Sequence, residues 1–119
     1  MTVQIKTPAG LDISTKPVGQ TIVSEYFDVT LYTLGKLAWV RLSTYAKKDM
    51  PKGVDISVPL PVKPAENIFA LYMNTIGATS VSTHLSANIT KDKGLTITCY
   101  GMDYPQGKSL NLSHMFFIQ

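Results

Sequence analysis

The sequence predicts an all-β fold, a small antiparallel β-barrel or sandwich of about seven strands. Apolar and polar residues alternate along much of the chain, and turns containing Gly or Pro separate the alternating runs. No segment shows a convincing amphipathic helical pattern. With 119 residues, the chain is long enough to form one domain with a core of its own.

The N-terminal segment differs from the rest of the chain. Thr7-Pro8-Ala9-Gly10 and Lys16-Pro17-Val18-Gly19 place Pro and Gly at a density that interrupts both helices and β-ladders. We therefore expect residues 1–19 to form an irregular arm, with at most a short strand from Val3 to Lys6. Residues 20–119 are expected to form the β-domain.

A long hairpin is predicted from the next part of the chain. Apolar and polar side chains alternate over residues 21–34 and again over residues 37–45, which is the period of a strand with one buried face. The short Leu34-Gly35-Lys36 connection between the two runs is typical of a hairpin. We expect two long strands joined by a tight turn.

Five more strands are predicted, over residues 54–58, 67–76, 81–89, 95–100 and 109–118. The run at 67–76 also suits helical spacing, and strand is the favoured interpretation. Three prolines in residues 59–64 exclude a central strand there and indicate an extended edge or a crossover. Gly94 ends a turn at a position that typically needs a positive φ.

Composition argues against several classes of protein. The net charge of +3 comes from interspersed charges and not from a concentrated basic stripe, so no nucleic-acid partner is expected. No run approaches the ~18 apolar residues of a membrane span, and the N-terminus lacks the apolar region of a signal peptide. Cys99 is the only cysteine, so no intrachain disulfide can form, which fits assembly in a reducing cytoplasm.

Motifs for catalysis or metal binding are absent from the sequence. His84 and His114 are the only histidines, and neither has a partner at metal-ligand spacing. Cys99 falls on an apolar strand face, where a thiol acts as a small hydrophobe. The acids are scattered, and Asp49, Asp55, Asp92 and Asp103 fall in or beside turns, where local backbone hydrogen bonds explain them. We expect no enzyme activity, metal or cofactor; a small hydrolase would depend on Asp103 and His84.

Three features are candidates for recognition. The loop from Tyr100 to Tyr104 combines two aromatic rings with the Asp103 carboxylate, which suits a sugar site, or it is a turn whose tyrosines brace one end of the domain. Trp39 is either a core or subunit-interface residue or a ligand platform. His84 shares a polar strand face that is either solvated or lines a groove between subunits. The candidate saccharide-binding residues are Tyr100, Asp103, Tyr104, His84 and Trp39.

The order of the parts is distinctive. A long hairpin (FDVTLYTLGKLAWVRLS) is followed by a proline-bounded segment (VPLPVKP), a strand–turn–strand (ANITKDKGLTI) and a terminal strand (SLNLSHMFFIQ). Over residues 20–119 this order resembles the C-terminal head domains of receptor-binding proteins from tailed siphophages of Gram-positive bacteria, and related small tail or baseplate proteins. The LPVKP stretch at residues 60–64 is similar to their LPxxYRP-type stretch. Val62-Lys63 stand where an aromatic residue and Arg are usual, and the trimerising shaft of those proteins is lacking.

The resemblance implies a β-barrel head, commonly trimeric, that binds host cell-wall carbohydrate near protomer boundaries without metal or cofactor. It also implies a place in the virion tail after assembly in the host cytoplasm, in contact with other phage tail proteins. The alternative is an accessory virion protein with the same fold that docks another tail component and binds no saccharide.

Overall fold

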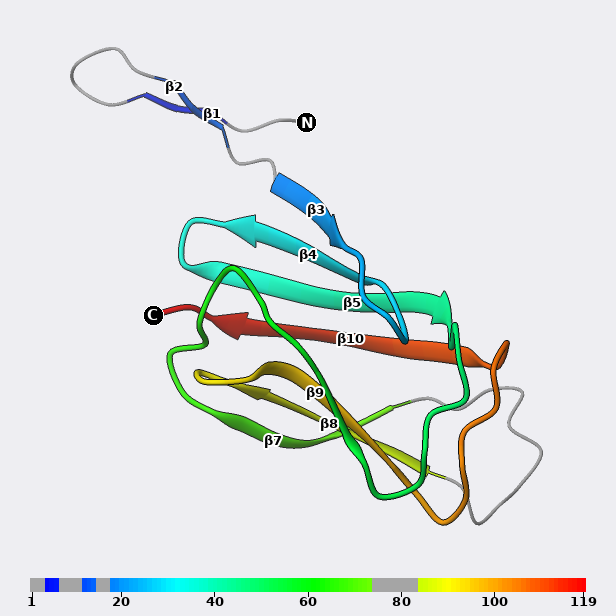
Figure 1. Ribbon diagram of the computed structural model, residues 1–119. Coiled ribbons are helices and arrows are strands. Elements are labelled where there is room, and N and C mark those ends of the chain that lie inside the picture. Colours follow the sequence, from blue (N-terminus) through cyan, green and yellow to red (C-terminus); the bar gives the residue numbers. More distant parts are fainter. Residues whose placement is uncertain (1–3, 7–11, 15–17, 74–83) are drawn as a thin grey trace.

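The computed structural model describes residues 4–6, 12–14, 18–73 and 84–119 of the chain (Figure 1). Eight of the strands form two four-stranded antiparallel sheets, sheet 1 with the order β10-β5-β4-β3 and sheet 2 with the order β6-β9-β8-β7. The strands are β1 (Gln4–Lys6), β2 (Asp12–Ser14), β3 (Val18–Ile22), β4 (Val29–Leu34), β5 (Leu37–Tyr45), β6 (Asp55–Val58), β7 (Ile68–Tyr72), β8 (His84–Thr90), β9 (Gly94–Tyr100) and β10 (Ser109–Phe117).

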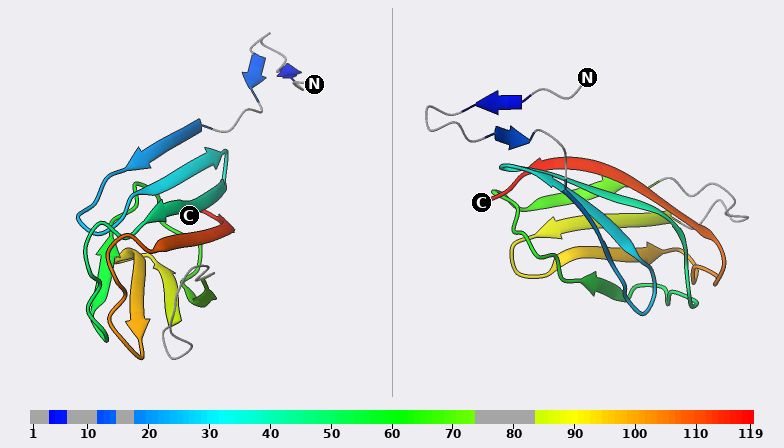
Figure 2. Two further views of the ribbon diagram at one scale, coloured as in Figure 1. Left: turned by 90° about the vertical axis from the view of Figure 1, so that its right-hand side faces the viewer. Right: turned by 90° about the horizontal axis from the view of Figure 1, so that it is seen from above.

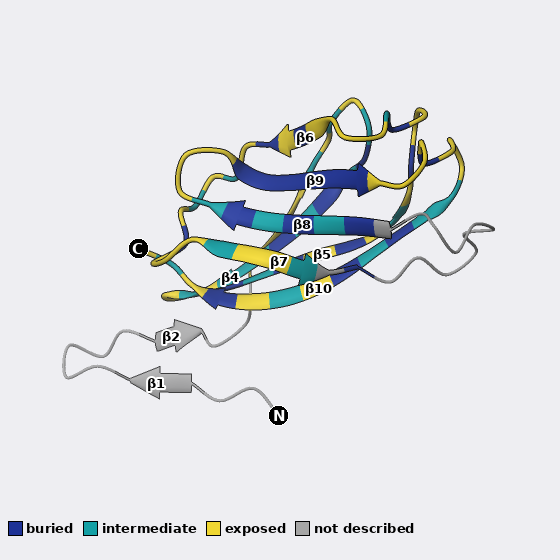
Figure 3. Ribbon diagram, turned by 90° about the horizontal axis from the view of Figure 1, so that it is seen from below, coloured by how far each residue is buried: buried dark blue, intermediate teal, exposed yellow. Residues whose placement is uncertain are grey.

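The two sheets pack as the layers of a β-sandwich, so the all-β prediction is confirmed (Figure 2). They remain separate sheets and do not close into a barrel. Alternate residues of each strand point between the layers, as the period of two requires. Figure 3 shows the result as bands of buried residues along β8 and β10, whereas β9 is buried almost throughout. The fully buried side chains include Val29, Leu31, Val40, Ile89, Leu95, Ile97 and Leu110.

The predicted hairpin is present, but its first strand is shorter than expected. Leu34 pairs with Leu37 across the Gly35-Lys36 turn, as predicted. The run over residues 21–34, predicted as one strand, is two strands, β3 and β4, which pair with each other. Between them, the Ser24 hydroxyl bonds to the backbone of Phe27, whose side chain is fully buried. Apolar alternation thus continues across a turn because Phe27 is inserted into the core from a loop.

The proline-rich segment is a crossover, one of the two alternatives predicted for it. It leads from β6 at one edge of sheet 2 to β7 at the other. Along the way it meets the end of sheet 1, where the Ala65 N–H donates to the Phe117 carbonyl at 2.8 Å and Gln119 N–H donates to the Lys63 carbonyl at 2.9 Å. Strand β7 confirms the strand interpretation for Ile68–Tyr72. Of the rest of the predicted run, Asn67 and Met73 lie outside the strand, and residues 74–76 lie outside the described residues.

Both faces of β9 are buried, although its sequence alternates apolar residues with threonine. Thr96 and Thr98 face outward and are 4% and 5% exposed. The edge strand β6 covers them, since Ser57 Oγ lies 2.8 Å from Thr96 Oγ1 and the Thr98 hydroxyl donates to Asp55 Oδ1 at 2.5 Å. These bonds satisfy the hydroxyl groups that burial would otherwise leave unpaired.

In the N-terminal segment, β1 pairs with β2, and β3 begins at Val18 and joins sheet 1. The short strand expected near Val3–Lys6 corresponds to β1, and Val3 itself lies outside the described residues. Within the part of the chain that the structure describes, no helix is long and apolar enough to cross a membrane.

Candidate binding face

The outer face of sheet 1 carries a row of aromatic and apolar residues that crosses four strands. Gly19 of β3 is opposite Tyr32 of β4, Tyr32 is opposite Trp39 of β5, and Trp39 is opposite Met115 of β10. Opposed residues point to the same side of an antiparallel sheet. We call Tyr32, Trp39 and Met115 the aromatic row.

The two rings of the aromatic row are held by several contacts. Their centroids lie 5.1 Å apart with an angle of 28° between the planes, which is a stacked arrangement. The indole Nε1 of Trp39 donates to Ser113 Oγ at 2.7 Å, and Arg41 Cζ lies 5.8 Å from the centroid of the Trp39 ring system. Both rings are partly exposed. The row is therefore a positioned aromatic platform on the surface.

Gly19 keeps the β3 end of the row open for the Tyr32 ring. A Cβ at this position would lie 2.7 Å from Tyr32 Cε1. Any larger residue at position 19 would displace the Tyr32 ring. The position of this ring therefore depends on a glycine at position 19.

Beside the platform lies a polar depression of about 380 Å³, lined by Asp28, Thr30, Tyr32, Arg41, Ser43 and Thr44. It offers a carboxylate as acceptor, a guanidinium as a planar donor, and hydroxyl groups that do both. Asp28 Oδ1 forms an ion pair with Lys47 Nζ at 2.5 Å, which ties the loop before β4 to the loop after β5. Aromatic rings next to mixed donors and acceptors suit a ligand with apolar faces and several hydroxyls.

At the other end of the same face the surface is apolar. Leu34, Met115 and Phe117 are 38%, 57% and 71% exposed. A small hollow of about 100 Å³ joins this end to the platform, because Leu34 and all three residues of the aromatic row line it. The outer face of sheet 1 thus changes from polar to apolar along the strands.

The structure places only one of the five predicted binding residues on this face, namely Trp39. Tyr100 and Asp103 belong to the other sheet and its loop. Tyr100 is the last residue of β9 in sheet 2 and is 44% exposed, and in the loop after β9 Asp103 Oδ1 accepts the Lys52 backbone N–H at 2.8 Å. Tyr104 is fully buried, and its hydroxyl donates to the Ser109 carbonyl at 2.5 Å. His84 is opposite Tyr100 in the β8–β9 ladder, and its side chain lies outside the described part of the structure.

Tyr104 therefore cannot stack on a sugar in this conformation, which removes it from the predicted set. Its backbone forms a two-way bridge with Met50, with N–O distances of 2.8 and 2.9 Å, and this bridge draws the loop inward. The alternative interpretation, a turn whose tyrosine braces the end of the domain, fits the position of Tyr104. Tyr100 and Asp103 remain candidates without a shared pocket among those described.

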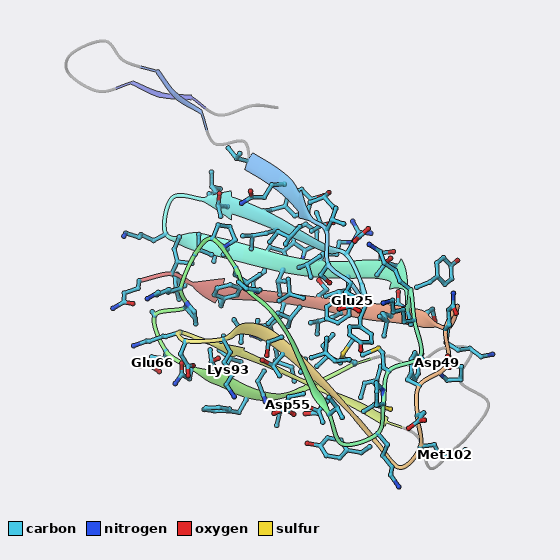
Figure 4. All side chains as sticks on the ribbon, viewed as in Figure 1. Glu25, Asp49, Asp55, Glu66, Lys93 and Met102 are labelled. Atoms are coloured by element: carbon cyan, nitrogen blue, oxygen red, sulfur yellow. The ribbon has the colours of Figure 1, made fainter. Side chains whose placement is uncertain are left out.

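Several acidic side chains have structural partners, and those labelled in Figure 4 do not share a site. In Figure 4, Glu25, Asp49, Asp55 and Glu66 lie apart on different loops and strands. Asp49 Oδ1 accepts the Gln106 N–H at 2.7 Å, so it joins two distant loops and does not act within its own turn as expected. Among the described residues, no group of three or more His, Cys, Asp or Glu is arranged to hold a metal ion.

Cys99 lies in the core, and its Sγ is 2.8 Å from the Met102 carbonyl oxygen. Burial, and secondarily the nearby Asp103 carboxylate, raises the pKa of the thiol above its ordinary value of 9.0. We expect alkylation by iodoacetamide at pH 8 to be at least ~100-fold slower in the native protein than in urea, because the reaction needs an opening of the fold. Mass spectrometry of quenched samples measures both rates, and similar rates would contradict a buried thiol.

Asp28, Tyr32 and Arg41 are residues of this face that the sequence analysis did not select. A signal for Tyr32 existed: a two-residue turn between Leu34 and Leu37 also sets Tyr32 opposite Trp39. Met115 carried no such signal, because its position depends on the pairing of β10 with β5, which are far apart in sequence.

Compared with known proteins, the chain matches no family model, no curated protein and no solved structure.

Proposed function

We propose that the chain is a non-catalytic, tail-associated protein of a bacteriophage that binds host cell-wall saccharide through the outer face of sheet 1. The resemblance of residues 20–119 to siphophage receptor-binding heads supports the phage assignment. The observation that carries the binding proposal is the stacked Tyr32–Trp39 pair, which lies beside the polar depression containing Asp28 and Arg41.

The chemistry of this face suits a pyranose ring. The C–H faces of a sugar pack on aromatic rings, and its hydroxyl groups exchange hydrogen bonds with carboxylates, guanidinium groups and hydroxyls. Trp39 supplies the larger ring, held by Ser113, and Arg41 and Asp28 supply a donor and an acceptor on the same side of it. A shallow site of this kind gives weak single-site affinity, which several copies on one virion would strengthen through avidity.

The alternative is an accessory virion protein that docks another tail component and binds no saccharide. The exposed side chains of Met115 and Phe117 favour it, since neighbouring large apolar side chains are typical of protein contacts. In that case the polar depression would lie at the rim of a protein interface.

Replacing Trp39 with alanine tests the saccharide site. We expect Trp39→Ala to weaken retention on purified Gram-positive cell walls by roughly thirtyfold, the effect of losing an aromatic binding residue worth about 2 kcal/mol. Co-sedimentation of the purified protein with walls from a panel of hosts gives the measurement. Phe69→Ala is the matched control, because Phe69 is an exposed aromatic residue (64%) on β7 of the other sheet and its loss should leave retention unchanged.

Three results would count against the saccharide proposal. No retention of the unchanged protein on any wall at micromolar concentration would favour the accessory protein. Equal losses in Trp39→Ala and Phe69→Ala would point to non-specific adhesion. Full retention by a folded Trp39→Ala variant would place the site on another face.

A further inference from the structure

Strand β3 forms one edge of sheet 1, and its far side is free among the described residues. Its register with β4 is regular from Val18 to Ile22, and no other described strand pairs with it. Residues 18–21 are exposed on both alternating faces, so β3 extends past the layer that covers the rest of sheet 1 (Figures 1 and 2). An edge of this kind presents a row of backbone N–H and C=O groups to solvent.

Two of the other three sheet edges, β6 and β7, carry features that oppose strand addition, and the third, β10, is occupied at its C-terminal end. Strand β6 has only four residues, begins with the exposed Asp55 and is followed by Pro59. Strand β7 is interrupted by a register shift, and its Ala70 has a φ of 58°. The end of β10 is already occupied, because Ala65 and Pro64 pair with Phe117 and Ile118. Bulges, prolines, charges and covering segments are the usual protection of sheet edges.

Within its own five residues, strand β3 has none of these protections, and Pro17 precedes it as Pro59 follows β6. Its sequence, VGQTI, contains no charge and no proline, and its ladder with β4 has no bulge. Since unprotected edges invite pairing, the regular ladder of β3 and the exposure of residues 18–21 mark this edge as an interaction surface. Its backbone groups define the partner as another extended strand.

We propose that β3 pairs antiparallel with β3 of a second copy of this chain, about a two-fold axis at Gln20. Gln20 is then opposite its own copy, Val18 is opposite Ile22, and Gly19 is opposite Thr21. The first two pairs place uncharged side chains together, and Val with Ile is a favourable cross-strand pair. Self-pairing of this strand places no like charges opposite one another. It joins sheet 1 of one copy to sheet 1 of the other, which gives a single sheet of eight strands.

The contact is small, and the dimer is therefore reversible. Five residues of edge pairing per copy fall below the roughly 1,200 Å² of typical stable interfaces, so association should depend on protein concentration. The arrangement also differs from the trimer implied by the resemblance, because an isologous contact closes with two copies. It does not depend on saccharide binding.

A charge-swap at Gln20 tests the proposal on the full chain. Gln20→Lys and Gln20→Glu each place like charges opposite one another at the axis, whereas an equal mixture places Lys opposite Glu. Sedimentation equilibrium over a range of concentrations should show the unchanged protein passing from 13.0 kDa to about twice that mass. Each single variant should lose the dimer, and the mixture should regain it. Gln106→Lys is the control for added charge, since Gln106 lies in an exposed loop, and it should dimerise like the unchanged chain.

The other outcomes overturn the proposal. A monomer at every concentration, or a trimer, excludes a two-fold β3 contact. A dimer that persists in both single variants uses another surface. A mixture that stays monomeric excludes pairing centred at Gln20.

Discussion

Replacing Gly94 with alanine is expected to destabilise the domain by at least ~3 kcal/mol, or roughly 10 °C in Tm. Gly94 ends the turn between β8 and β9 with a φ of +77°, a conformation that costs a residue with a side chain about 1–2 kcal/mol. The new Cβ would also lie 2.4 Å from the Val58 carbonyl oxygen and 2.8 Å from the Leu60 backbone nitrogen. Because both are backbone atoms, relief requires movement of the end of β6 and the start of the crossover. Urea and thermal denaturation measure the loss.

Gly53→Ala separates strain from steric contact in this result. Gly53 has nearly the same backbone conformation, with a φ of +75°, but no atom lies within 4 Å of the added Cβ. We expect this variant to lose only the conformational part, about 1–2 kcal/mol. Equal losses in the two variants would contradict the close approach of the crossover to Gly94.

The local sequence pattern was sufficient to predict the β4–β5 hairpin, but it did not predict the break between β3 and β4. The turn at Gly35 limits the possible pairings to one, so the register and the facing of Trp39 could be predicted from the sequence. The break after Ile22 could not, because Phe27 continues the alternation while lying in a loop. That loop is held by contacts with residues far away in the sequence, for example the hydrogen bond that the Lys47 backbone N–H donates to the Tyr26 carbonyl at 2.8 Å. Alternation reports burial, and a loop residue can be buried as well.

The candidate site was less predictable than the fold because it depends on which strands lie side by side. Trp39 was selected as a lone aromatic residue, whereas its surroundings come from four strands. Ser113 and Met115 reach it only through the pairing of β10 with β5, which no local motif encodes. For Tyr104 the sequence suggested a site residue that the structure buries, since a Tyr between Asp and Pro is typical of an exposed loop. Its bridge to Met50 reverses that expectation.

Replacing Tyr104 with alanine is expected to cost about 4 kcal/mol of stability, in the range for loss of a buried aromatic side chain. The ring is fully buried and its hydroxyl is bonded to Ser109, so truncation leaves a cavity and removes a hydrogen bond. Tyr104→Phe keeps the ring and should lose only about 1 kcal/mol. Tyr100→Ala, at a position 44% exposed in the same region, should change stability by less than about 1 kcal/mol.

Alkaline pH provides an independent test of the same burial. Burial, with a smaller contribution from Cys99, raises the pKa of the Tyr104 phenol above its ordinary value of 10.0. The unfolded chain therefore loses this proton first, and the stability that the neutral phenol contributes declines as the pH rises through 10. In Tyr104→Phe this part of the decline should disappear, which urea denaturation at pH 8 and pH 10.5 measures. Two results would contradict this burial: a parallel loss of stability with pH in the unchanged protein and in Tyr104→Phe, or an equal loss of stability in Tyr104→Ala and Tyr100→Ala. In either case Tyr104 is not a core residue, and its ring is again a candidate for a ligand site.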